Sequence, residues 1–293
     1  MGNLNHHAWM ARRPRRAARG FSLIELMVAL LVGMLVVGAL MAGYYAVTVS
    51  NRNGQARAQV TEDASIALNM LRTHLVEAGY SRVVSVGATK FVQAYTGRAV
   101  FGCDGAFVDP SLDIGALTCA GTSGSDSLAV AYEADSTSKG NSLLSGGVPL
   151  DCLGNTLSVI AGPSGNYYLN YSRFYLATSG VSTHLALYCR GPGNNTGQAL
   201  VENIEDLQIK YGTTTAAGIS AKPVPVVEYV DAKDVADWAL VVTVRVCVVA
   251  ASTNEVMDDK TPYIDCQGNK VTPSDKRMYR AFTSTVVLHN RLG

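Results

Sequence analysis

Residues 20–30 read GFSLIELMVAL, and this stretch joins a basic leader to a long apolar run. The 24 residues from Leu26 to Val49 include no Asp, Glu, Lys or Arg. As a helix with a rise of ~1.5 Å per residue they would be roughly 36 Å long, enough to cross a hydrocarbon layer of ~30 Å. A carboxylate at membrane depth is costly and marks a functional position, so Glu25 stands out at the start of this run.

The charge on either side of the apolar run predicts its orientation. Five arginines and no acidic residue precede Gly20, so the leader is expected to stay in the cytoplasm and the chain beyond Val49 to be exported. Without residues 1–20 the chain has 19 basic and 23 acidic residues, a net charge of −4. Because an acidic exported part lacks the basic footprint of a nucleic-acid-binding protein, we expect no nucleic-acid partner.

The N-terminal pattern resembles the signature of type IV prepilins and pseudopilins. In that family a membrane peptidase cuts after the Gly and methylates the new N-terminal residue. The fifth mature residue, a carboxylate, neutralises the N-terminal amine of a neighbouring subunit. The resemblance implies cleavage between Gly20 and Phe21, N-methylation of Phe21 and a subunit-assembly role for Glu25. An ammonium and a carboxylate that meet in a low-dielectric layer offset each other's desolvation, which supports this pairing.

Three other N-terminal signals compete with this interpretation. A secretory signal peptide has an apolar region of about 7–15 residues before its cleavage site, whereas this run is longer and follows the cut. The paired arginines lack the sequence that follows them in a twin-arginine signal, and a plain anchor leaves Glu25 unexplained. We therefore expect residues 1–20 to be a cleaved cytoplasmic leader. Met10 is an alternative start that gives a leader of eleven residues.

Helical spacing continues beyond the apolar run. Apolar residues recur at helical intervals at Val60, Ala64, Ala67, Leu68, Leu71 and Leu75, and Gly79 is expected to cap the helix. The sequence therefore predicts one helix from about Phe21 to Ala78. Residues 21–50 would form its transmembrane and filament-core half, and residues 51–79 its amphipathic half, which packs on a sheet.

Residues 80–293 change to short β-like runs separated by turns, which predicts a β-rich globular domain in the periplasm or outside the cell. The clearest expected strands are 83–86, 127–132, 157–160, 167–171, 174–178, 185–189 and 241–249. Apolar residues alternate with Thr243, Arg245 and Cys247 in the last of these, as expected of a half-buried strand. The predicted fold class is α+β: a long N-terminal helix packed on an antiparallel sheet-rich domain, type IV pilin-like.

All six cysteines lie on the expected exported side, at Cys103, Cys119, Cys152, Cys189, Cys247 and Cys266. An even number in an oxidising compartment predicts disulfides, and six cysteines allow fifteen connectivities. Pairing between neighbours in sequence would join 103 with 119, 152 with 189 and 247 with 266, and the last pair is the favoured one. The cysteine spacing and the scattered histidines argue against zinc, so no metal is predicted.

The C-terminal third resembles the minor pilins of the PilW type. The resemblance rests on residues 199–212 (ALVENIEDLQIKYG), on Asp237-Trp238 before the strand 241–249, and on the closing strand 279–291 (YRAFTSTVVLHNR). Arg is more usual in the family at the position of His289. Residues 87–198 match no motif that we can name.

Motifs of enzymes are missing from the sequence. It has no nucleophile elbow, no P-loop and no H-E-x-x-H motif, so we expect no catalytic residue, no cofactor and no enzyme. Residues 135–140 vaguely resemble a calcium loop, but Lys139 occupies a position that needs an oxygen ligand. We expect a solvated loop there.

The resemblance implies a minor pilin that helps prime type IV pilus assembly, supports twitching motility and sits in a minor-pilin complex at the pilus tip. Its partners would be other minor pilins, the major pilin, a tip adhesin, the prepilin peptidase and the inner membrane. The chain would cross that membrane once, with the globular domain in the periplasm, before assembly into the extracellular pilus. The alternatives are a pseudopilin of a type II secretion system, which the N-terminal signature does not separate, and a membrane-tethered exported enzyme or ligand-binding domain.

Overall fold

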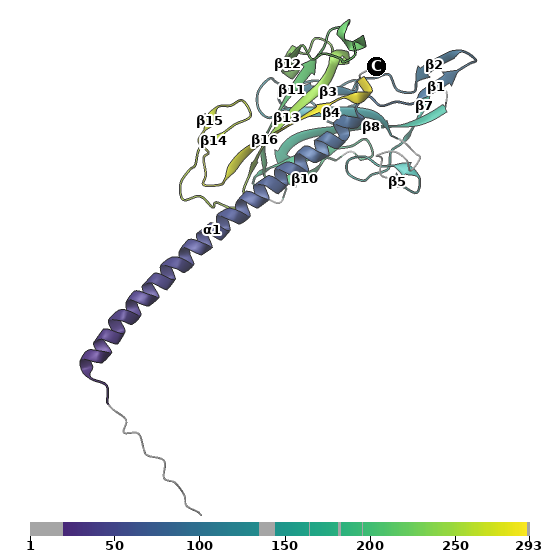
Figure 1. The fold of residues 1–293 in the computed structure, drawn as a ribbon. Coiled ribbons are helices and arrows are strands. Elements are labelled where there is room, and N and C mark those ends of the chain that lie inside the picture. Colours follow the sequence, from purple (N-terminus) through teal and green to yellow (C-terminus); the bar gives the residue numbers. More distant parts are fainter. Residues whose placement is uncertain (1–19, 135–143, 164, 181–182, 195, 292–293) are drawn as a thin grey trace, which may run out of the picture. The chain divides into compact units, whose positions relative to one another are not determined.

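The computed structural model describes residues 20–134, 144–163, 165–180, 183–194 and 196–291 (Figure 1). The expected leader, apart from Gly20, and the expected loop 135–140 therefore lie outside the described residues. The chain forms two compact units, Met1–Asn51 and Arg52–Gly293, and the boundary falls inside the helix α1 (Leu23–Glu77). The single 55-residue helix agrees with the helix predicted from 21 to 78, and differs from it by a few residues at the ends.

The part of α1 beyond the boundary buries one stripe of side chains. The buried residues are spaced three and four apart, at Ala56, Val60, Ala64, Ala67, Leu71 and Leu75. From Val60 onward, they join strands of both large sheets in one hydrophobic core. This stripe is the amphipathic pattern of the sequence, since residues at these intervals share one face of a helix.

Gly79 ends the helix as predicted. It adopts a φ of 75°, a left-handed conformation that glycine takes without steric cost, and its N–H donates to the Ala131 carbonyl at 2.8 Å. A Cβ at this position would lie 3.0 Å from the Ala99 Cβ. The glycine therefore lets the chain leave the helix while it stays in close contact with the first sheet.

Two antiparallel sheets make up most of the globular unit. The first has the order β10-β9-β8-β4-β3, with β7 also paired to β8. Its strands are β3 (Val100–Cys103), β4 (Ser127–Ala134), β7 (Val159–Gly162), β8 (Gly165–Thr178), β9 (Leu185–Arg190) and β10 (Gln198–Glu202). The second has the order β12-β11-β13-β16, from β11 (Ile204–Thr213), β12 (Glu228–Val230), β13 (Val241–Ala251) and β16 (Tyr279–Val287). The α+β class with an antiparallel sheet-rich domain is therefore confirmed.

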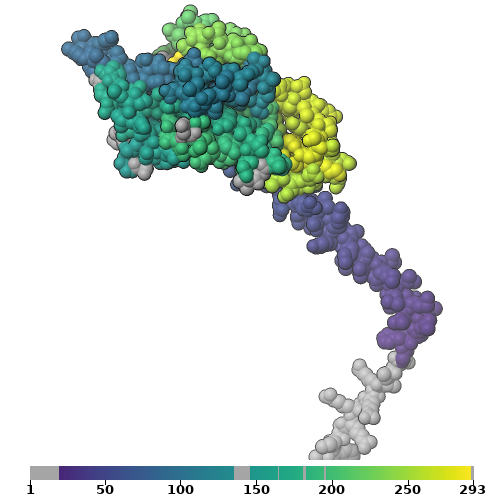
Figure 2. Space-filling model, turned by 180° about the vertical axis from the view of Figure 1, so that it is seen from behind, coloured from purple at the N-terminus to yellow at the C-terminus, as the bar shows by residue number. Residues whose placement is uncertain are grey.

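Three small strand pairs and four short 3₁₀ helices complete the described elements. The pairs are β1 (Val83–Val86) with β2 (Lys90–Gln93), β5 (Leu144–Ser145) with β6 (Val148–Pro149), and β14 (Tyr263–Ile264) with β15 (Lys270–Val271). The short helices are η1 (Gly218–Ser220), η2 (Ala232–Asp234), η3 (Trp238–Leu240) and η4 (His289–Arg291). Figures 1 and 2 show the β1–β2 hairpin at the periphery of the globular unit.

The chain passes from the first sheet to the second at Asn203, between β10 and β11. Asn203 adopts a φ of 60°, a conformation that asparagine tolerates better than most residues. Its side-chain amide donates to Thr253 Oγ1 at 3.1 Å and its carbonyl oxygen accepts from Arg277 at 3.3 Å. The segment 199–212, which carries the PilW resemblance, is therefore the crossover between the two sheets.

Four strand predictions need correction in their bounds. The strands expected at 167–171 and 174–178 are one strand, β8, because Ser172 and Arg173 continue the pairing with β4. Arg173 is buried, and its guanidinium donates to the Leu112 and Gly191 carbonyls. These hydrogen bonds compensate the desolvation of the charge, so the strand continues through this position. The strand expected at 157–160 begins at Val159 instead. The closing strand ends at Val287, and η4 follows it.

The alternation expected in residues 241–249 is also wrong. Every residue of β13 is buried except Arg245, so both faces of the strand are covered and not one. The Cys247–Cys266 disulfide draws the segment around β14 and β15 over the face away from α1, which buries Cys247 there. Leu240, the residue before the strand, lies in η3.

Candidate assembly site on the N-terminal helix

Helix α1 begins at Leu23 because Ser22 caps it. The Glu25 backbone N–H donates to Ser22 Oγ at 3.3 Å, and the Leu26 N–H donates to the Ser22 carbonyl at 3.2 Å. Ser22 and Glu25 have the S-x-x-E spacing of a capping box. Phe21, where the helix was expected to begin, therefore stays outside it, and the Gly20–Phe21 bond lies in non-helical chain just before the cap.

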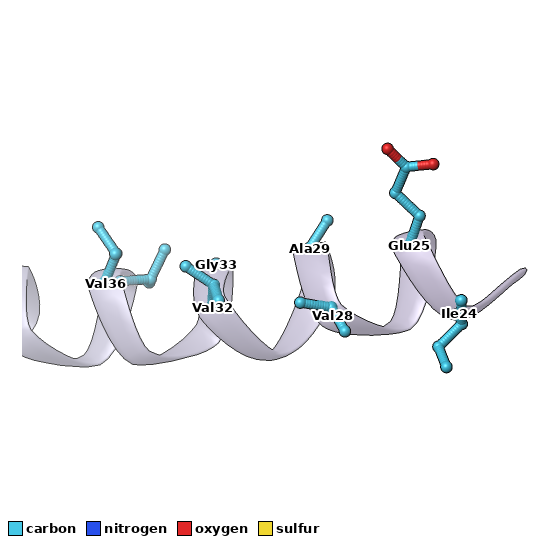
Figure 3. Close-up of a pocket in the computed structure, with 8 residues that line it drawn as sticks. Ile24, Glu25, Val28, Ala29, Val32, Gly33 and Val36 are labelled. Carbon is cyan, nitrogen blue, oxygen red and sulfur yellow. The ribbon is translucent and has the colours of Figure 1, made fainter. Parts of the chain in front are cut away.

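Glu25 is in the first turn of α1 and its side chain is exposed. Figure 3 shows the carboxylate projecting away from the helix on the same side as Ala29. No described residue is hydrogen-bonded or ion-paired to this carboxylate. The amino end of a helix stabilises a negative charge, so the ionised carboxylate is favoured at this position. It is available to bind a cation of another molecule.

The helix around Glu25 exposes an unusually apolar surface. Phe21 is 84% exposed, Leu23 78%, Leu35 75% and Tyr44 74%. An 18-residue window of α1 reaches a mean hydropathy of 2.6 with none of it buried, so the helix is long and apolar enough to cross a membrane. An exposed apolar surface of this extent requires lipid or other protein to cover it.

The side chains in Figure 3 form a strip along one helix. They include Ile24, Val28, Val32 and Val36 beside Glu25. A single helix cannot enclose a small molecule, so we interpret the strip as a packing surface for another helix or for lipid. It is not a ligand pocket.

The six cysteines form three disulfides, and no cysteine is free. The bridges are Cys103–Cys119, Cys152–Cys189 and Cys247–Cys266, with Cα separations of 5.4, 6.5 and 5.8 Å. These are the pairs between neighbours in sequence. Within the described residues, no group of three or more His, Cys, Asp or Glu side chains is arranged to hold a metal ion.

Two titratable groups of the globular unit have strongly shifted pKa values. Burial against Phe174 and Tyr132 lowers the pKa of His74 to about 4, so this imidazole is neutral at physiological pH. Burial raises the pKa of Asp126 to about 7, although the Ile209 N–H donates to its carboxylate. The half-buried position of His74 and the buried position of Asp126 could not be predicted from the sequence, since polar residues are usually exposed.

The burial of the Arg277 guanidinium was also not predicted from the sequence. It donates to the Ser252 carbonyl, to Glu205 Oε1 at 2.6 Å and to Asn203 Oδ1 at 3.3 Å. Arg277 therefore links the start of β16 to the crossover between the two sheets. No local sequence signal marks such a contact, because its partners are some 25 to 74 residues away along the chain.

Comparisons with known proteins match both ends of the chain. Residues 173–290 match the family described as Type IV Pilus-assembly protein W, and residues 15–41 match the prokaryotic N-terminal methylation motif. A type IV-like pilin from Thermus thermophilus is similar in structure, with 10% sequence identity and a TM-score of 0.39 over 80% of this chain and 97% of that one. A comparison with curated protein sequences finds no match.

Proposed function

We propose that the chain, which joins an N-terminal methylation motif to a match with the pilus-assembly protein W family, is a PilW-type minor pilin, a non-enzymatic subunit that helps prime pilus assembly. In this proposal it acts in few copies, within a minor-pilin complex that ends at the pilus tip. Its partners there are other minor pilins, the major pilin and a tip adhesin.

Processing by the prepilin peptidase is the first step of the proposal. Residues 1–20 remain in the cytoplasm, the peptidase cuts between Gly20 and Phe21, and the amine of Phe21 is methylated. The Ser22 cap supports this order, because it starts the helix after the scissile bond and leaves that bond in non-helical chain. Residues 21–50 then anchor the subunit in the inner membrane until it enters the filament.

The observation that carries the assembly role is the exposed Glu25 on an uncovered apolar helix. When helices of several subunits pack together in lipid or in a filament, this carboxylate leaves water and requires a cation. The N-terminal amine of a neighbour supplies one, and the pair offsets the desolvation of both charges. Uncovered apolar side chains such as Leu23 and Leu35 provide the surface on which the neighbouring helix packs.

The size of the globular part supports a position at the tip. Residues 80–293 follow the helix, and they form a large domain for a subunit that would repeat at close spacing along a fibre. At a tip nothing stacks above the domain, so its bulk is tolerated there. The match of residues 173–290 to the pilus-assembly family favours the pilus over a type II secretion pseudopilin.

Quantitative mass spectrometry of sheared pili tests the proposal. A priming subunit at the tip should be present at a small fraction of the major pilin. Deletion should sharply reduce surface pili, and blocking retraction should partly restore them. A stoichiometry near that of the major pilin would instead make this chain a subunit of the shaft.

A further inference from the structure

A polar cleft of about 510 Å³ lies on the face of the second sheet that points away from α1. Its floor includes Lys210 from β11, Arg245 from β13 and Thr283 from β16. Neighbouring residues along these strands, such as Ile209 and Val246, belong to the hydrophobic core, so the floor residues point to the other side. The cleft is therefore distinct from the apolar helix surface and from the core.

The walls of the cleft are held in place by independent contacts. The Cys247–Cys266 disulfide ties one wall to β13. Gln208, which pairs with Cys247 in the strand register, donates its side-chain amide to the Gly124 carbonyl at 3.1 Å. The Asp104 carboxylate accepts two backbone N–H groups from η2 at the end of the cleft. A cavity with walls fixed in this way is preformed, and preformed sites lose little conformational entropy when they bind a ligand.

Most charges in the cleft neutralise one another. Lys210 forms an ion pair with Asp231. Lys233 lies 3.3 Å from Asp231, 3.3 Å from Asp234 and 3.6 Å from Asp104. The two lysines therefore face three aspartates, and neither lysine has a positive charge left to pair with a ligand.

Asp126 contributes a weak negative charge near neutral pH. It is buried at the edge of the cleft, where its carboxylate accepts the Ile209 N–H at 2.6 Å. Burial raises the pKa of Asp126 to about 7, so the group is partly protonated at neutral pH. Its carboxylate therefore offsets only part of the positive charge of a nearby cation.

Arg245 is the cation that remains. It is the one exposed residue of β13, and its guanidinium carbon lies 4.1 Å from the centre of the Tyr229 ring. It stands directly opposite Lys210 in the strand register, and Asp231 already neutralises the charge of that lysine. No carboxylate among the described residues forms an ion pair with it. The planar guanidinium fork is suited to bind a carboxylate through two hydrogen bonds.

We propose that this cleft binds an acidic peptide segment of another pilus component, with a carboxylate of that segment on the Arg245 guanidinium. The inference rests on the proposed function, from which it takes the source of the partner. A peptide suits the site because the lining includes the hydroxyl side chains of Ser123 and Thr283, which can bond backbone amides. The floor from β11 to β16 spans two strand spacings, roughly 10 Å, which is about three residues of extended chain.

Carbodiimide coupling in membranes that contain assembled minor-pilin complexes tests this inference with the full chain. The variant Arg245→Lys keeps the positive charge and introduces an amine that the reagent joins to a carboxylate in direct contact. The matched control is Arg280→Lys, the same exchange at an exposed arginine of β16 that stacks on Phe282 and lies outside the cleft lining. Arg245→Glu, compared with Arg280→Glu, measures the contribution to complex formation by co-purification.

The amine at position 245 should couple to an Asp, Glu or C-terminal carboxylate of another pilus component, and the amine at position 280 should not. Co-purification should fall at least tenfold for Arg245→Glu and stay within twofold for Arg280→Glu. Coupling only to Asp104, Asp126 or Asp231 of the same chain would overturn the inference, as would coupling to a small free acid. A preparation in which each variant still forms its disulfides excludes misfolding as the cause.

Failure of this inference and failure of the proposed function give different results. If only the inference fails, the wild-type chain co-purifies with pilus components and Arg245→Glu does so equally well. If the proposed function fails, the wild-type chain itself does not co-purify with them.

Discussion

Acidification should destabilise the globular unit through His74. His74 belongs to α1 and packs against the first sheet. Its Nδ1 lies 3.2 Å from the Tyr132 hydroxyl, and the centre of its ring lies 5.1 Å from that of the Phe174 ring. Desolvation lowers its pKa from 6.5 to about 4, and the negative charge of Asp151 offsets only part of that effect. The folded chain therefore resists a proton that the unfolded chain accepts.

The sign of the effect follows from proton binding. Between pH 6.5 and pH 4 the unfolded state binds a proton at His74 that the folded state does not, so stability falls as the pH falls. At 1.36 kcal/mol per pH unit, the difference reaches about 3 kcal/mol at pH 4. That is a large part of the 5–15 kcal/mol that typically separates folded from unfolded protein.

Urea denaturation of the mature chain in detergent micelles can measure this contribution at pH 7, 5 and 4. Trp238 is the one tryptophan after Gly20 and packs on Phe101 and Tyr211, so its fluorescence reports unfolding of the globular unit. The comparison of wild type with His74→Gln isolates the single titration, and His289→Gln controls for the exchange at an exposed position.

The free-energy difference between wild type and His74→Gln should decrease by about 3 kcal/mol from pH 7 to pH 4. Asp126 acts with the opposite sign: burial raises its pKa from 3.8 to about 7, so its contribution to stability is lost as the pH rises from about 4 to about 7. The contribution of Asp126 to the pH dependence of stability is measured in the same way, by comparison of wild type with Asp126→Asn. A difference for His74→Gln that stays constant across the pH range would refute the reasoning about this histidine.

Three further predictions address processing, assembly and the disulfides. Gly20→Arg should block cleavage, whereas the wild-type chain should begin at a methylated Phe21; N-terminal mass analysis checks both, and a wild-type chain cut after residue 49 would contradict the prepilin assignment. Glu25→Ala should still be inserted and cleaved but should be recruited poorly into minor-pilin complexes, and wild-type motility with normal co-purification would show that the pairing role is wrong. Replacing Cys247 and Cys266 together by Ser should lower the stability of the globular unit by about 3 kcal/mol, because their bridge closes a loop with a sequence separation of 19; unchanged urea midpoints would argue against that constraint.

Local patterns predicted most of the helix and several strand positions. The long helix follows from an uncharged run joined to a stripe of residues spaced three and four apart, and Gly79 marks its end because glycine suits a left-handed cap. The start of the helix was placed two residues early, although the S-x-x-E spacing of Ser22 and Glu25 was available as a signal. These features depend on contacts within one turn, so a sequence shows them directly.

Features that depend on distant contacts could not be predicted in this way. Both faces of β13 are buried because groups distant in sequence contact the face that alternation alone would leave in water: Cys266 is bonded to Cys247, and Tyr229 accepts a hydrogen bond from Thr243. Arg173 continues β8 across an expected break because carbonyl oxygens of Leu112 and Gly191 accept its N–H groups. In both cases the compensating group lies far away in the chain. The alternation of apolar and polar residues within one strand gives no information about such a group.

The segment that resembles the PilW family is also the segment that joins the two sheets, and this gives the resemblance a physical basis. Asn203 turns the chain in a left-handed conformation, and Arg277 holds that turn from the start of β16. Loss of the arginine would leave the Glu205 carboxylate and the Ser252 carbonyl without this donor, and removing one partner of a buried charge pair costs about 3–5 kcal/mol. A crossover that depends on residues so far apart in sequence constrains both segments at once, and the family model, which spans 173–290, includes both. The sequence elements that carry the family signature therefore fix the relative arrangement of the two sheets, and with it the cleft that contains Arg245.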